Sequence, residues 1–256
     1  MPTALVTGAS SGIGLHFARR LADDGYDLVL VARSRERLTQ TAQVLQHEHG
    51  VTCEVLRADL GRLADCRRVE RRLTDVPLDL LVNNAGIGLY DGDFVDHDLE
   101  AEDHLLMVNV RAVLRLTHAA LGPMLQRGQG AIINVSSMAS FAPDPNAPTY
   151  AASKAWVTSF TEGLREQVNG SGVRLLALTP GLVPTEFQER AGVQARVPSP
   201  FWLDPDDVVD TALADLRAGR GVSVPGVAYR AVRLAMQLTP RRVYLPLSDT
   251  LQKRLT

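Results

Sequence analysis

Residues 3–14, TALVTGASSGIG, decide the fold of this 256-residue chain. The first five residues are apolar or β-branched, as in a buried strand, and glycines follow at positions 8, 12 and 14. Such glycines permit a tight turn and let backbone amides approach an anion at the N-terminus of a following helix. The stretch therefore predicts a strand, a phosphate-binding turn and a helix.

The same alternation of short apolar runs and longer amphipathic segments continues along the chain. The amphipathic segments include 34–49 and 103–128, and the predicted strands cover residues 3–7, 27–32, 52–58, 78–84, 130–136, 173–179 and 222–225. Apolar strands joined by helices predict an α/β fold, with a doubly wound, Rossmann-type parallel sheet of about seven strands and helices on both faces. We expect one domain over 1–256, with its ligands at the carboxyl ends of the strands.

Composition narrows the class of protein. Hydrophobic residues make up 45% and charged residues 22%, which fits a globular domain, and the net charge of −2 gives no general basic field for nucleic acid. Cys53 and Cys66 lack metal-ligand spacing, so we expect reduced thiols and no metal site. A strand directly at residue 3 leaves no room for a signal peptide, and we expect a cytoplasmic protein.

The end of the second predicted strand indicates which dinucleotide binds. A protein that binds NAD usually has an acidic residue about 20 residues past the glycine turn, which accepts a hydrogen bond from the ribose 2′-hydroxyl. An arginine at this place suits the 2′-phosphate of NADP. This chain has Ala32 and Arg33 there, and its next acid is Glu36. Because a guanidinium can bind phosphate in bidentate fashion, the sequence favours NADP(H) over NAD(H).

Tyr150 and Lys154, in the stretch TYAASKAW (149–156), lie one helical turn apart and share a helix face. An ammonium beside a phenol favours the phenolate, so we expect the lysine to lower the tyrosine pKa toward neutrality. Each residue alone also fits a plain structural role, as a half-buried helix tyrosine or a solvated lysine.

In its motifs and their order, the chain from residue 3 to about 225 resembles the short-chain dehydrogenase/reductase superfamily, in its compact single-domain branch. The motifs that carry the resemblance are TGASSGIG (7–14), ADL (58–60), NNAG (83–86), NV (109–110), INVSS (133–137), YAASK (150–154) and PGLVPT (180–185). Beyond Gly226 the resemblance weakens.

The resemblance implies a catalytic set of Asn109, Ser137, Tyr150 and Lys154; Ser137 is selected over Ser136 because it lies thirteen residues before the tyrosine. Tyr150 would donate the proton, Ser137 would stabilise the substrate oxygen, and Asn109 would hold a water near Lys154. The implied cofactor contacts are Gly8, Ser10, Ser11, Gly12, Ile13, Gly14, Arg33, Asp59, Leu60, Asn84, Ala85, Gly86, Tyr150, Lys154, Pro180, Gly181, Val183 and Thr185. The family also implies a homodimer or homotetramer through helices near 100–127 and 150–168.

Three segments should shape the substrate pocket. Residues 185–205 would cover the active site, and Phe201, Trp202 and Leu203 either line an apolar pocket or staple the next helix. The proline-rich 140–148 would form a stiff wall.

The third segment, 226–256, is an amphipathic basic extension with Val227, Ala231, Leu234 and Leu238 on one face. We expect this extension to pack over the pocket or against a second subunit. Binding to an anionic membrane is the third, less favoured alternative.

The expected activity is hydride transfer between NADP(H) and an apolar ketone, an aldehyde or a secondary alcohol. Two alternatives remain open: a regulator that binds NADP(H) without turnover, and a membrane-peripheral lipid or 3-oxoacyl reductase that uses the basic extension. A complete set of Asn109, Ser137, Tyr150 and Lys154 argues against a sensor, which has no need of all four.

Overall fold

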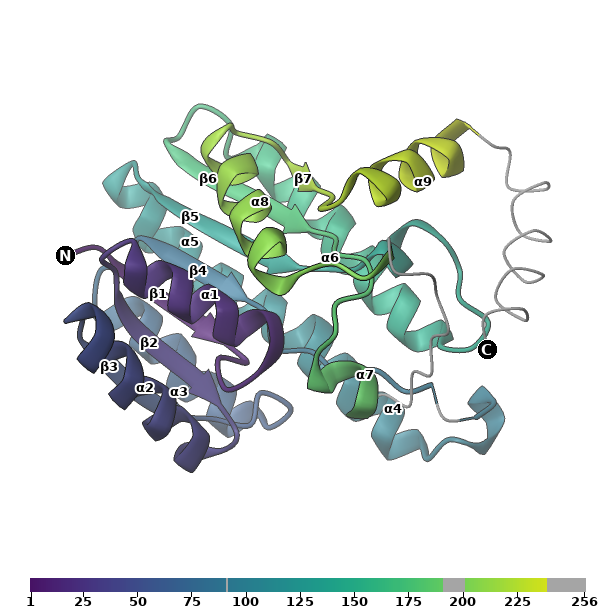
Figure 1. The fold of residues 1–256 in the computed structure, drawn as a ribbon, viewed down its shortest axis with the longest axis horizontal. Helices are drawn as coiled ribbons and strands as arrows, with labels where there is room; N and C mark the ends of the chain where they lie inside the picture. Colours follow the sequence, from purple (N-terminus) through teal and green to yellow (C-terminus); the bar gives the residue numbers. More distant parts are fainter. Residues whose placement is uncertain (91, 191–200, 239–256) are drawn as a thin grey trace.

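The computed structural model describes residues 1–90, 92–190 and 201–238 (Figure 1). In these residues, seven parallel strands form one sheet in the order β3-β2-β1-β4-β5-β6-β7. The strands are β1 Thr3–Thr7, β2 Asp27–Ala32, β3 Cys53–Arg57, β4 Leu80–Asn83, β5 Gly130–Val135, β6 Val173–Leu178 and β7 Val222–Ser223. All seven coincide with the runs predicted from the sequence to within two residues at each end.

Helices cover both faces of the sheet, as predicted. Their bounds are α1 Gly12–Asp23, α2 Arg35–His49, α3 Leu63–Asp75, α4 Leu99–Leu106, α5 Val113–Arg127, α6 Pro148–Gln167, α7 Glu186–Arg190, α8 Pro205–Arg217 and α9 Val227–Leu238, with short turns η1 Phe94–Asp96 and η3 Met138–Phe141. Apolar residues of α1, α2 and α8 pack in one core layer, and those of α3, α5 and α6 contribute to the other.

Strand β1 shows why its sequence is apolar without alternation. Ala4 and Val6 face the layer under α1, Leu5 faces the layer under α3 and α5, and all three are fully buried. A strand covered on both faces needs apolar side chains on both. Strand β1 pairs with β2 on one side and with β4 on the other, so the order reverses beside it and opens a crevice at the carboxyl edge.

The predicted helix over 103–128 is longer and contains an irregularity. Helices α4 and α5 are joined by a π-helical stretch η2, Met107–Ala112, into a continuous run over 99–127. By length and composition this run would also be able to cross a membrane. Its buried side chains, among them Leu105, Ala112 and Leu116, pack inside the domain, as in the core helix of a globular protein.

Candidate active site

A cavity of about 1560 Å³ runs along the carboxyl edge of the sheet. Residues at or just after the ends of β1, β2, β3, β4, β5 and β6 line it, together with residues of α9. All residues assigned to the site from the sequence line this cavity except two, Gly14 and Asn109. Gly14 packs under the glycine turn, and Asn109 is fully buried beside the site.

The glycine turn is packed against the end of β4. Gly8 has a φ of +68°, and a Cβ atom placed on it would lie 2.7 Å from the Asn84 side-chain nitrogen, so no larger residue fits. Asn84 in turn donates to the Thr7 carbonyl at 2.9 Å, and its backbone N–H donates to the Thr7 hydroxyl. This contact holds the turn open toward the cavity.

The turn suits the diphosphate of a dinucleotide. The Ser11 side chain at the N-cap of α1 makes no capping hydrogen bond, so side chains do not satisfy the first amides of this 12-residue helix. These amides and the positive end of the helix dipole form an anion site. Beyond the turn, Asp59 and Leu60, which follow β3, line the same cavity. The residues present therefore fit an NAD(P) cofactor.

Arg33 follows β2, is exposed and lines the same cavity. Within the described residues its guanidinium has no ion-pair partner, whereas Arg37, which also lines the cavity, pairs with Glu186 of α7 at 2.8 Å. The Ser34 side chain is engaged as the N-cap of α2, where it accepts from the Arg37 N–H at 3.3 Å. Arg33 is thus the basic group at this end of the cavity that is available to a phosphate.

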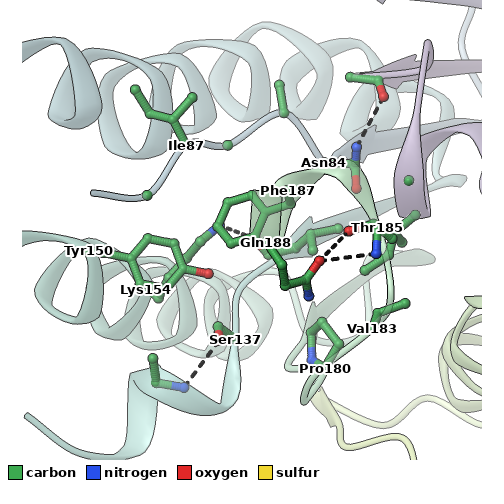
Figure 2. Close-up of a pocket in the computed structure, with 18 of the residues that line it drawn as sticks. Asn84, Ile87, Ser137, Tyr150, Lys154, Pro180, Val183, Thr185, Phe187 and Gln188 are labelled. Atoms are coloured by element: carbon green, nitrogen blue, oxygen red, sulfur yellow. Dashed lines mark hydrogen bonds between the residues drawn. The ribbon is translucent and has the colours of Figure 1, made fainter. Parts of the chain in front are cut away.

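Tyr150 and Lys154 project from one face of α6 into the cavity, as the four-residue spacing predicts (Figure 2). Both residues are buried. The lysine Nζ lies 5.7 Å from the centre of the tyrosine ring and donates a hydrogen bond to the Val135 carbonyl at 2.9 Å. The backbone at the end of β5 therefore fixes the ammonium beside the phenol.

The pKa values of Tyr150 and Lys154 differ from those expected from the sequence. Burial raises the pKa of Tyr150 to about 12, against the opposing effect of a hydrogen bond with Ser137. Burial also lowers the pKa of Lys154 to about 8. The prediction that the lysine brings the tyrosine pKa toward neutrality is wrong for the protein without cofactor, because removal from water disfavours the charged form of both groups.

The two serines after β5 have different surroundings. The Ser136 hydroxyl donates to the Lys154 carbonyl at 2.7 Å and accepts from Thr158, so it is a buried link between β5 and α6. Ser137 lines the cavity, and its oxygen accepts from the Ala139 N–H at 3.2 Å (Figure 2). The preference for Ser137 over Ser136 agrees with this geometry.

Asn109 lies in the π-helical stretch η2, behind the cavity wall. Its side chain accepts from the Ile87 N–H and donates to the Ile87 carbonyl, each at 2.9 Å, and it also donates to the Ser153 hydroxyl at 3.1 Å. Asn109 therefore ties the loop after β4 to the helix that carries Tyr150. No sequence pattern indicated this link or the π-helical stretch in which Asn109 lies.

Aromatic and apolar groups form the far half of the cavity. The rings of Tyr90 and Phe187 stand 5.6 and 5.8 Å from the Tyr150 ring, centre to centre. The predicted wall over 140–148 contributes the apolar Ala142 and Pro143 and the polar Asp144 and Asn146. Burial raises the pKa of the Tyr90 phenol, so that group remains neutral.

The stretch with Phe201, Trp202 and Leu203 combines the two predicted alternatives, because it both lines the pocket and packs against the core next to α8. Phe201 lines the cavity, whereas Leu203 packs against the core, and Trp202 pairs with Leu182 in an isolated bridge. Residues 191–200 of the predicted covering segment lie outside the described residues.

Helix α9 packs over the cavity, although not with the face that the sequence pattern selected. Tyr229, Val232 and Met236 line the cavity, and the Tyr229 hydroxyl bridges the Leu182 N–H and the Phe201 carbonyl at 2.9 and 2.8 Å. The predicted apolar stripe from Val227 to Leu238 faces away from the domain. The remainder of the basic extension, 239–256, lies outside the described residues.

Neither a metal centre nor a reactive thiol is evident in the described part of the chain. There, no three His, Cys, Asp or Glu side chains are placed to hold a metal ion. Cys53 and Cys66 are free, and burial raises the pKa of each thiol to about 11, so both stay protonated near neutral pH.

Comparisons with known proteins agree with this geometry. An uncharacterised oxidoreductase from Staphylococcus saprophyticus is 33% identical over 231 residues, covering 90% of this chain and 97% of the relative. A short-chain dehydrogenase from Sphingobium yanoikuyae, solved in complex with NADPH, superposes with a TM-score of 0.83 at 37% identity and covers 94% of this chain and 97% of its own. The bulky-bulky ketone specific alcohol dehydrogenase from Comamonas testosteroni gives 0.80 at 33% identity, with 99% and 93% coverage.

The profile of the short chain dehydrogenase family matches residues 2–195, which include the glycine turn, Ser137 and the pair of Tyr150 and Lys154. With this match and the relatives above, the chain belongs to the short-chain dehydrogenase/reductase superfamily of oxidoreductases.

Proposed function

We propose that this oxidoreductase is an NADP(H)-dependent reductase of bulky, apolar ketones or aldehydes that also oxidises the matching secondary alcohols. One observation carries the proposal: Ser137, Tyr150 and Lys154 converge midway along a cavity that has a phosphate-binding turn at one end and an apolar chamber at the other. A cofactor and a carbonyl substrate would meet at these three side chains.

The preference for NADP(H) rests on Arg33. This arginine stands exposed at the adenosine end of the cavity without an ion-pair partner among the described residues, and no acid lies between Ala32 and Glu36. A 2′-phosphate would therefore meet a free guanidinium and no nearby carboxylate on this loop. The NADPH bound to the Sphingobium relative supports the same preference.

A bound nicotinamide would supply the hydride that reduces the carbonyl carbon, and it would be held by Tyr150, Lys154 and the segment from Pro180 to Thr185. The substrate oxygen then needs a proton. Tyr150 supplies this proton: with a pKa near 12 it is fully protonated at neutral pH and is an acid, not a base, before reaction. Ser137 donates a hydrogen bond to the same oxygen as negative charge develops there.

Lys154 and Asn109 would restore the acid after each turnover. Proton transfer leaves a phenolate on Tyr150, and the ammonium beside it stabilises that charge. Lys154, with a pKa near 8, then passes a proton to the phenolate and regains one from solvent. By family resemblance a water near Asn109 would link the lysine to solvent, and the Asn109 contacts with Ile87 and Ser153 would keep that path aligned.

The substrate class follows from the walls of the chamber. Tyr90 and Phe187 stand against the Tyr150 ring, and Phe201, Val232 and Met236 add apolar surface to a cavity that polar side chains also line. Such walls favour an apolar carbonyl compound, and the large volume favours substituents of some size on both sides of the carbonyl. The likeness to an alcohol dehydrogenase specific for bulky-bulky ketones supports this choice.

We further propose a homodimer or homotetramer formed by α5 and α6. Leu114 and Leu125 of α5 are 43% and 40% exposed, and Trp156 stacks on Phe160 at 4.6 Å on α6. Exposed apolar groups of this kind commonly mark subunit contacts. Sedimentation equilibrium of the full chain at micromolar concentration tests the assembly, and a monomer under these conditions would refute it.

The decisive experiment follows NADPH consumption against carbonyl compounds graded by size, from short aldehydes to decalone and steroid ketones. We expect turnover with the bulky members and none with Tyr150→Phe, which should still bind NADPH because its ring and packing remain. Equal activity of Tyr150→Phe would refute the assigned proton donor. Tight NADPH binding without turnover of any carbonyl would favour the alternative of a non-catalytic NADP(H)-binding regulator.

A further inference from the structure

Residues 185–188, TEFQ, begin and end with two polar side chains that line the cavity, Thr185 and Gln188. The Gln188 side-chain oxygen accepts from the Thr185 backbone N–H at 3.1 Å and from the Thr185 hydroxyl at 2.8 Å (Figure 2). The proposed function places Thr185 in the segment that would hold the cofactor, and it gives Gln188 no role.

A threonine followed three residues later by a glutamine is also the signature of a capping box at the start of a helix. In that arrangement the threonine hydroxyl accepts from the backbone N–H of the third helical residue. Here the Gln188 N–H donates to the Thr185 carbonyl at 3.1 Å, and the hydroxyl is itself a donor. The capping box is therefore only half formed, and the hydroxyl oxygen keeps its lone pairs for another donor.

Chemistry fixes the direction of both hydrogen bonds. A backbone N–H can only donate, so the atom of Gln188 that faces Thr185 must be its carbonyl oxygen. That oxygen can only accept, so the Thr185 hydroxyl directs its single hydrogen at it. Within the part of the chain that the structure describes, no N–H or O–H donates to the Thr185 hydroxyl. This hydroxyl is thus available to a ligand as an acceptor and not as a donor.

The Thr185 acceptor lies between the two ends of the site. A Cβ atom placed on Gly12 of the phosphate-binding turn would lie 3.2 Å from the Thr185 Cβ atom. On the other side, the ring of Phe187 stands 5.8 Å from that of Tyr150, centre to centre. The pyridine ring of a bound dinucleotide has to span this interval, because its diphosphate would occupy the turn and its hydride has to reach a carbonyl at Tyr150.

We propose that Gln188 is a positioning residue that makes the site select a primary carboxamide on the pyridine ring of the cofactor. With its hydrogen held by Gln188, the Thr185 hydroxyl accepts from the NH₂ of a carboxamide but cannot donate to a carbonyl oxygen. A hydroxyl that is free to rotate can do either, so it would not distinguish a carboxamide from another carbonyl substituent. This inference rests on the proposed NADP(H) dependence and adds a residue that controls recognition of the pyridine ring.

The test compares NADP⁺ with its 3-acetylpyridine analogue, in which a methyl group replaces the carboxamide NH₂ and the carbonyl remains. Calorimetric titration of the full chain gives the ratio of the two dissociation constants without any turnover. We expect the wild type to bind NADP⁺ about tenfold more tightly than the analogue, because only NADP⁺ can donate to Thr185.

Variants of Gln188 separate positioning from packing. Gln188→Leu should make the two affinities nearly equal, since the released hydroxyl can then donate to either carbonyl. Gln188→Glu keeps the accepting oxygen and should keep the wild-type ratio, whatever its charge does to both affinities together. Gln43→Leu, the same change at an exposed position of α2 that does not line the cavity, is the matched control.

A double-mutant cycle tests whether Gln188 acts through Thr185. Thr185→Val should also equalise the two affinities, and adding Gln188→Leu to it should change the ratio no further. Adenosine 2′,5′-bisphosphate, which lacks the pyridine ring, should bind the wild type and Gln188→Leu equally well and so checks that the variant is folded.

Several outcomes would overturn the inference. They are equal affinities in the wild type, a wild-type ratio in Gln188→Leu, a lost ratio in Gln188→Glu, and a further change in the double variant. Equal weakening of both dinucleotides by Gln188→Leu would show that the residue only caps α7. A wild type that binds neither dinucleotide would instead refute the proposed NADP(H) dependence, and the inference with it, so the two failures are distinguishable.

Discussion

Replacing Lys154 with methionine should stabilise the cofactor-free protein near neutral pH while it removes activity. Lys154 is 5% exposed, and its amine is held against the Val135 carbonyl without a carboxylate among the causes of its pKa shift. A methionine has nearly the same length and no charge. The substitution therefore removes a buried ammonium and leaves the packing of α6 against β5 in place.

The magnitude follows from the pKa. Its fall from 10.5 to about 8 means that the folded protein disfavours the charged lysine by roughly 3 kcal/mol relative to the unfolded chain. The variant regains this free energy but leaves the Val135 carbonyl without its donor, which costs about 1–2 kcal/mol. We expect a net gain of about 1–2 kcal/mol in the free energy of unfolding at pH 7.

The pH dependence is the sharper part of the prediction. Below pH 8 the lysine is charged in the folded and unfolded states, and the cost of burial is fully present. Between pH 8 and 10.5 the unfolded chain keeps the proton that the folded protein has lost, so wild-type stability rises with pH. Most of the 3 kcal/mol should return by pH 10, and the advantage of the variant should then disappear or change sign.

Urea unfolding of both proteins at pH 7 and pH 10, without cofactor, measures this difference. All other titrating groups are shared by the two proteins, so the change in the difference between them reports Lys154 alone. A stability difference that stays constant from pH 7 to 10 would show that the buried amine is not forced toward its neutral form, and the reasoning would fail.

Three further predictions address cofactor, chemistry and substrate. Arg33→Ala should weaken NADPH binding roughly 10- to 100-fold and NADH binding little, whereas Arg35→Ala, which does not line the cavity, should change neither; fluorescence titration with both cofactors decides this. Ser137→Ala should lower kcat by about 10²–10³ with an unchanged melting temperature, and a loss confined to KM would contradict its role toward the developing charge. Met236→Trp should lower kcat/KM for bulky ketones far more than for short aldehydes, while Gln237→Trp, exposed on the same helix, should leave both alone.

The fold was predictable because its signals are local. Strands buried on both faces must be apolar throughout, and a parallel sheet requires helices between them, so the alternation of 3–7, 27–32 and later strands with amphipathic segments determines the layers. The positions of Tyr150, Lys154 and Ser137 at strand and helix ends follow from the same topology. Short motifs were therefore enough to bring the site together.

Features that depend on tertiary contacts were not predictable. The π-helical stretch that contains Asn109, and the hydrogen bond of Asn109 to Ile87, have no signature in the residues around them. Helix α9 carries apolar residues on both sides, so its pattern did not reveal that Tyr229, and not Val227, would face the domain. Apolar periodicity indicates that one side of a helix packs against the protein. Where a helix has two apolar sides, the pattern does not show which of them is buried.

The error in the Tyr150 pKa bears on the mechanism. Attraction between phenolate and ammonium favours a low tyrosine pKa, but both groups also lose their water at the end of β5, and this loss dominates. When both effects act, the resting site holds a neutral phenol beside a lysine of lowered pKa. The ammonium is then most valuable after the proton has left Tyr150, because only then does a second charge stand close to it. In the proposed carbonyl reduction, Lys154 would therefore stabilise the state that follows proton transfer and lower the barrier to it, and alcohol oxidation would depend on a higher pH.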